Sequence, residues 1–63
     1  MIKLTVIESQ HGLPLGSVRI RTSKLLAYEQ RAGFTRLRLV GGQWLSVKEG
    51  TAEIDHLVQR AAS

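Results

Sequence analysis

Large aromatic side chains and cations alternate between residues 34 and 48, the most strand-like part of the sequence. Phe34, Arg36 and Arg38 occupy every second position of one segment, and Trp44 and Lys48 lie four positions apart in the next. Alternate residues of a strand point to the same face of a sheet. Aromatic rings can stack on bases and cations can neutralise phosphates, as on sheets that hold single-stranded nucleic acids. These five residues are the first candidates for a binding face.

The same residues have a second interpretation. An apolar patch with a polar rim marks many protein–protein surfaces, with aromatic residues as anchors and arginines around them. Arg19 and Arg21 alternate outward on an earlier segment. They would extend the basic surface if their strand adjoined the hairpin, and would otherwise form an ordinary solvated strand face. The sequence leaves both alternatives open.

Catalytic groups do not form a recognisable constellation in the sequence. Ser9 lies near His11, and Asp55 precedes His56, but adjacent helical residues point in different directions and do not form a dyad. Cysteine is absent and the two histidines are far apart, so we expect no metal and no cofactor. The sequence predicts a binding module and not an enzyme.

Length and charge narrow the class further. A 63-residue chain with no cysteine has a small core and no disulfide to support it, so we expect a homo-oligomer. The net charge of +4 favours an anionic partner, such as nucleic acid or a nucleotide, although it also serves solubility. No apolar stretch resembles a signal peptide or a membrane span, and we expect a cytoplasmic protein without membrane contact.

Periodicity predicts a single α+β domain over residues 1–63, with an antiparallel sheet of four to five short strands over about 2–48. Period-two alternation or β-rich composition marks five segments, at 2–8, 17–22, 25–30, 34–40 and 43–48. We expect a connection at 9–16, a turn at 31–33, and Leu26 and Tyr28 on one face.

The Gly41-Gly42 pair predicts a hairpin, and its register can be argued from the apolar residues. A three-residue loop at 41–43 sets Leu39 opposite Leu45 and Leu37 opposite Val47. A one-residue slip would separate this apolar set. Under this register the core face holds Leu37, Leu39, Leu45 and Val47. The opposite face then holds Phe34, Arg36, Arg38, Val40, Trp44, Ser46 and Lys48.

A C-terminal helix is predicted over about 51–61, packed on one face of the sheet. Gly50 or Thr51 can serve as its N-cap, and Glu53 places a carboxylate in the first turn. One apolar stripe runs along it at helical spacing, made by Ile54, Leu57, Val58 and Ala61.

Two resemblances follow from these segments. The first resemblance depends on a series of segments. In order, these are Met1-Ile2-Lys3-Leu4-Thr5, Leu25-Leu26-Ala27-Tyr28-Glu29, Thr-x-Leu-x-Leu, a glycine turn, Leu45-Ser46-Val47-Lys48-Glu49 and a helix with Glu53-Ile54. A chain with this order resembles the FlbD-like flagellar or swarming-motility proteins and similar small phage proteins. Such proteins usually carry serine where this chain has Gly50. Residues 18–58 also look like the core of a LytTR-type DNA-binding domain, through Leu26-Ala27-Tyr28-Glu29 and the following strand pair and helix. The first resemblance implies an interaction module of a flagellar or phage type, and the second implies a nucleic-acid partner.

Overall fold

The fold was examined in a computed structural model, which describes residues 1–10 and 14–62. Five strands precede one helix, which confirms the predicted α+β class. The elements are β1 (Ile2–Ser9), β2 (Gly16–Ile20), the short 3-10 helix η1 (Thr22–Lys24), β3 (Leu25–Arg31), β4 (Phe34–Leu39), β5 (Trp44–Val47) and α1 (Thr51–Ala62). Part of the predicted connection at 9–16, including His11, lies outside the described residues.

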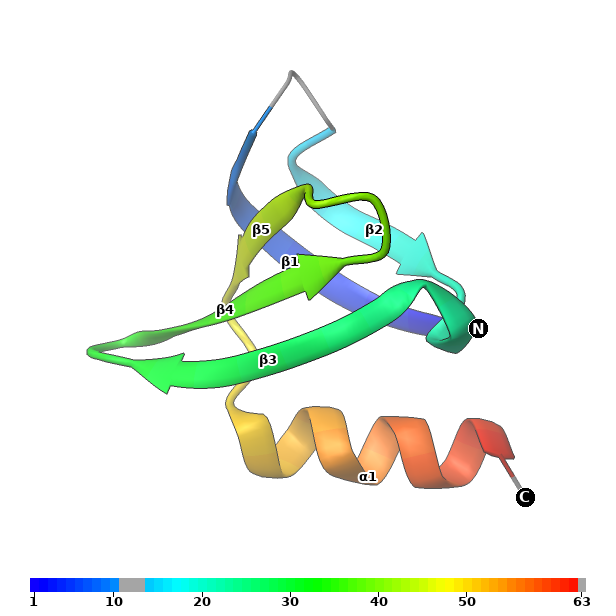
Figure 1. The fold of residues 1–63 in the computed structure, drawn as a ribbon. Helices are drawn as coiled ribbons and strands as arrows, with labels where there is room; N and C mark the ends of the chain where they lie inside the picture. The colour runs from blue at the N-terminus through cyan, green and yellow to red at the C-terminus, as the bar shows by residue number, and fades with distance from the viewer. Residues whose placement is uncertain (11–13, 63) are drawn as a thin grey trace.

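All five strands form one antiparallel sheet in the order β2-β1-β5-β4-β3. The first strand therefore lies beside the last one, at the centre of the sheet. Figure 1 shows that the sheet is strongly twisted, so that β1 crosses behind β4. The helix α1 runs along one side of the sheet and contacts β1 and β3.

The core lies on the concave side of this twisted sheet. It is formed by Ile2, Leu4, Val6, Ile20, Leu37, Leu45, Val47 and, from the helix, Ile54. Thr35 is also fully buried among these residues, and its hydroxyl has no hydrogen-bond partner in the described part of the chain. Alternation along β1 and β4 places these side chains inward, because every second residue of a strand points to the same face.

The β4–β5 hairpin keeps the predicted faces but not the predicted pairs. Leu37 lies opposite Leu45, and Thr35 lies opposite Val47. The Leu39 N–H donates to the Gln43 carbonyl, so the loop holds residues 40–42 and not 41–43. The register is thus offset by two residues from the prediction, and an even offset leaves every side chain on its predicted face. Gly41 and Gly42 have φ values of +105° and +89°, which glycine adopts readily.

Two further sequence expectations are wrong. A β-bulge between Leu25 and Ala27 turns Leu26 outward, where it is 64% exposed, while Tyr28 is half-buried on the core side. The bulge breaks the alternation on which the shared face of Leu26 and Tyr28 depended. On the helix, Ile54 is buried and Leu57 and Val58 are half-buried, but Ala61 is exposed. Only the part of the apolar stripe from Ile54 to Val58 therefore packs against the sheet.

The helix start is held by a residue from β3. The Ile54 N–H donates to the carbonyl of Gly50, so Gly50 is the cap residue. The Thr51 N–H donates to Oε1 of Gln30 at 3.2 Å. Nε2 of Gln30 donates to the carbonyl oxygens of Arg31 and Phe34, both at 3.0 Å. One amide side chain thus ties the helix N-terminus, which needs acceptors for its free N–H groups, to the β3–β4 turn.

A carboxylate ties the other side of the helix start to β1. Oε1 of Glu49 accepts the Thr5 N–H at 2.8 Å, and Oε2 accepts the Thr5 hydroxyl at 2.9 Å. Burial opposes ionisation of Glu49, but these hydrogen bonds outweigh it, and the pKa of Glu49 is lowered from its ordinary value. The ionised form of Glu49 therefore stabilises the folded state.

We expect this contact to make stability fall in acid. Because the folded pKa of Glu49 lies below the unfolded value of about 4.3, its contribution is complete above that pH and is lost as the pH falls through the folded pKa. Urea unfolding of wild type and Glu49→Gln from neutral pH into acid measures the effect. The difference in unfolding free energy should shrink on acidification. Glu53→Gln, four residues further along, is the matched control, and an equal pH trend in both variants would contradict the assignment.

Candidate interaction surface

The convex side of the sheet carries polar, charged and aromatic side chains in cross-strand rows. The strand registers set Glu8, Ser46, Arg36 and Glu29 opposite one another across β1, β5, β4 and β3. Trp44, Arg38 and Ala27 form the neighbouring row. We call this surface the outer face, defined by Glu8, Glu29, Phe34, Arg36, Arg38, Trp44 and Ser46.

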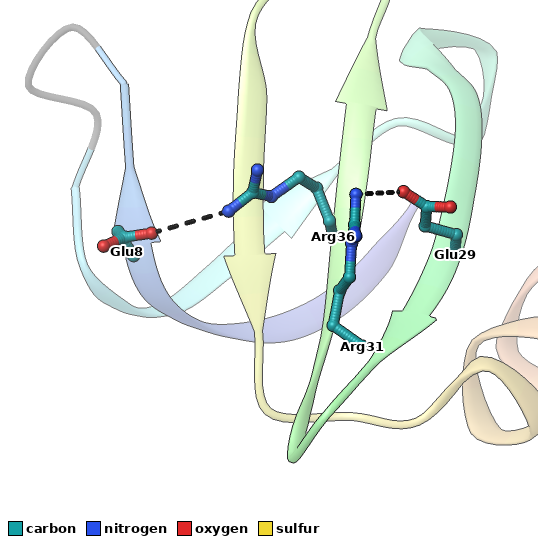
Figure 2. A network of polar contacts seen from close by, with 4 residues as sticks. All are labelled: Glu8, Glu29, Arg31 and Arg36. Atoms are coloured by element: carbon teal, nitrogen blue, oxygen red, sulfur yellow. Dashed lines mark ion pairs between the residues drawn. The ribbon is translucent and has the colours of Figure 1, made fainter.

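Arg36 occupies the middle of the outer face. Its guanidinium carbon lies 4.5 Å from the centre of the Trp44 ring and 5.9 Å from that of Phe34. Figure 2 shows the side chain reaching from β4 across β5 towards Glu8 on β1, where Nη2 lies 3.9 Å from Oε1. Cation–π contacts at such distances contribute about 0.5–1 kcal/mol at exposed sites and more when desolvated. Arg36 therefore lies over one face of the Trp44 ring and near the Phe34 ring.

A second ion pair borders the same surface. Nη2 of Arg31 lies 2.6 Å from Oε1 of Glu29, and both side chains are at least half exposed (Figure 2). Such exposed pairs add little to stability. Together with Arg36, Arg38 and Ala27 they line a shallow hollow of about 310 Å³. The outer face thus combines both signs of charge with aromatic surface.

Several polar atoms under this surface lack partners. Nε of Arg36, Oγ of Ser46 and Oε1 of Gln10 are buried without a hydrogen-bond partner among the described residues. Gln10 belongs here because its N–H donates to the carbonyl of Trp44. A buried polar atom without a partner costs about 1–3 kcal/mol. The polar atoms beneath the outer face therefore have fewer hydrogen-bond partners than the side chains of Gln30 and Glu49.

The sequence did not indicate all members of the outer face. Glu8 was placed at the end of a strand, and Ile7 was assigned no role. A β-bulge between Val6 and Glu8 changes the alternation of β1. Ile7, 49% exposed, then joins Glu8, Phe34 and Ser46 around a hollow of about 210 Å³. The adjacent apolar pair Val6-Ile7 breaks the alternation at this point, but such a pair does not by itself identify a bulge.

The predicted site residues fall into three places. Phe34, Arg36, Arg38 and Trp44 share the outer face. Arg19 and Arg21 do not extend it through the sheet, because β2 is the far edge strand and pairs only with β1. They line another hollow with Lys24 and the β4–β5 loop. Lys48 follows the end of β5 and lines a third hollow with Thr5, Glu49 and Glu53.

Groups with catalytic potential are engaged elsewhere in the fold. Asp55 accepts a hydrogen bond from the Tyr28 hydroxyl, which packs against the core side of the sheet. This hydrogen bond, together with partial desolvation and the nearby charge, raises the pKa of Tyr28 from its ordinary value. Over residues 1–10 and 14–62, no three histidine or acidic side chains are grouped so that they could hold a metal ion. None of the helices described is long and apolar enough to cross a membrane.

Comparison with known proteins gives no family for this chain. No family model, no curated protein sequence and no solved structure matches it.

Proposed function

We propose that this chain is a non-catalytic protein-interaction module that self-associates through the outer face. The observation that carries the proposal is the position of Arg36 over Trp44 and Phe34. A nucleic-acid platform needs bare rings on which bases can stack. An arginine resting on aromatic side chains inside a polar rim has instead the composition of a protein-binding hot spot.

The charges of the outer face support a second copy as the occupant. Glu8 and Glu29 stand in one row with Arg36, and Arg38 stands in the next. A two-fold interface brings the same patch together from both subunits, so a self-complementary patch needs both signs of charge. The ion pair between Arg36 and Glu8 is long, and the Glu8 side chain is mostly exposed. Its members can exchange partners with the other copy at little cost.

The small size of the core supports the same proposal. A domain of this length gains only about 3–5 kcal/mol from its own core. The proposal includes the cytoplasmic setting and the flagellar or phage-type role that the sequence suggests, in which a partner protein would occupy the same face.

Sedimentation velocity over a wide range of protein concentration tests the proposal. We expect a reversible monomer–dimer equilibrium. Trp44 is the only tryptophan, so its emission should shift to shorter wavelength in the same concentration range as it loses water. A strict monomer at the highest attainable concentration, with constant emission, would rule out self-association.

A nucleic-acid partner is the second candidate function, favoured by the net charge of +4 and by Arg31, Arg36 and Arg38 around one hollow. Its affinity should fall steeply with salt. If single-stranded DNA or RNA at low salt displaces the dimer and quenches Trp44, the outer face is a nucleic-acid site and the first proposal fails.

A further inference from the structure

A second surface, separate from the outer face, collects cations without acids. It lies where the end of β2, the helix η1 and the β4–β5 loop meet, and Figure 1 shows this loop next to β2. The Val40 N–H donates to the Lys24 carbonyl at 2.8 Å and holds the loop against η1. The resulting hollow of about 350 Å³ is lined by Arg19, Arg21, Lys24, Leu39, Val40 and Gln43, along with Ile20. We call it the basic hollow.

The charges of the basic hollow are unbalanced. Arg19, Arg21 and Lys24 all line it, and no Asp or Glu does. Across residues 1–10 and 14–62 none of these three side chains forms an ion pair. Arg36 of the outer face and Arg31 at its border differ, since each lies near a glutamate. Like charges held together oppose folding, so an anion bound here would stabilise the domain.

We propose that the basic hollow binds a phosphate group. A phosphate carries about −1.5 to −2 charges and three acceptor oxygens, which suits a set of three cations better than a single carboxylate does. Arginine guanidinium groups present paired donors that match phosphate oxygens, and lysine adds a compact charge. Gln43 supplies a neutral amide on the same wall.

The apolar wall of the basic hollow indicates what the phosphate is attached to. Leu39 is half-buried, and Val40 is 54% exposed beside the cations. Small-molecule sites typically combine apolar surface with a few charged or polar groups, in volumes of about 300–1,000 Å³. A mononucleotide fits this combination, because its base can cover the apolar wall while its phosphate meets the cations. Free phosphate can make only the contact with the cations.

Amide NMR titration of the full chain tests the proposal. Inorganic phosphate and adenosine monophosphate are added in separate arms at constant ionic strength, with sodium acetate as the carboxylate control. We expect saturable shifts at residues 19–24 and 39–43 with both phosphate compounds, and tighter binding of the nucleotide. Tighter binding of free phosphate would overturn the nucleotide assignment but keep the phosphate site. Equal shifts with acetate, or no saturable shift at these residues, would overturn the proposal.

Charge reversal localises the site. Arg19→Glu with Arg21→Glu should weaken nucleotide binding at least about tenfold, since hydrogen bonds between a cation and a phosphate are among the stronger polar contacts of a binding site. Arg36→Glu with Arg38→Glu makes the same charge change on the outer face and is the matched control, which should leave binding in the basic hollow unchanged. The reverse pattern would move the anion site to the outer face and refute the basic hollow. If a variant fails to fold, the titration of the wild-type chain is sufficient to test the phosphate site. Both the titration and the charge-reversal experiment measure binding in the basic hollow, so neither depends on whether the chain self-associates.

Discussion

Ile54→Ala should leave most of the chain unfolded at room temperature. Ile54 is the one fully buried residue that the helix contributes to the core. Truncating a buried isoleucine to alanine costs about 2–5 kcal/mol, which is similar to the whole net stability of about 3–5 kcal/mol that a core of this size supplies. Circular dichroism and urea unfolding at one fixed protein concentration measure the loss.

Leu26→Ala is the matched control for this substitution. It also removes a branched aliphatic side chain, but Leu26 is 64% exposed on an edge strand. Its unfolding free energy should change by no more than about 0.5 kcal/mol. A stable, fully helical Ile54→Ala variant would mean that the helix is held mainly by Gln30 and Glu49 and not by burial of its apolar face.

Arg36→Glu should convert the self-associating protein to a monomer. The substitution removes the cation above Trp44 and places a third acid in the row of Glu8 and Glu29. In a two-fold interface these acids would face their own copies. Like charges across an interface cost several kcal/mol, so the dissociation constant of the dimer should rise about 100-fold. Sedimentation velocity measures the shift.

Arg19→Glu provides the control, because it makes the same charge change on the basic hollow. Its dimer should form as in the wild type. Arg36→Lys separates charge from shape, since lysine keeps the cation but cannot lie flat on the ring, and its dimer should be intermediate in strength. If Arg19→Glu and Arg36→Glu weaken association equally, net charge and not the outer face controls it.

The sequence was sufficient for the fold class and for the faces of most strands. Alternation in β1 and β4 identified Ile2, Leu4 and Leu37 as core residues, because a half-buried strand imposes that pattern. The same alternation placed Phe34, Arg36 and Trp44 on the face away from the core, even though the register is offset by two residues from the prediction. Local periodicity contains the information that these decisions require.

Contacts between distant segments were not predictable from the same information. The bulges at Ile7 and Leu26 fall where two apolar residues are adjacent, but the broken alternation does not show which of the two faces the core. The support of the helix start by Gln30 depends on an approach between β3 and α1, 21 residues apart. The separation of Arg19 from Arg36 depends on strand order, which places β1 and β5 between them. Site geometry in this domain is set by topology, and topology was the part that periodicity did not determine.

The pairing of the first strand with the last one also governs how the chain can fold during synthesis. β1 can form its hairpin with β2 early, but its other edge stays open until β5 has left the ribosome, some forty residues later. The central ladder and the Thr5–Glu49 contact, which joins residues 44 positions apart, thus form late. Such non-local pairing slows folding compared with helical domains of equal size. Until then the apolar side of β1 is exposed, so the nascent chain is most prone to aggregation before β5 has emerged.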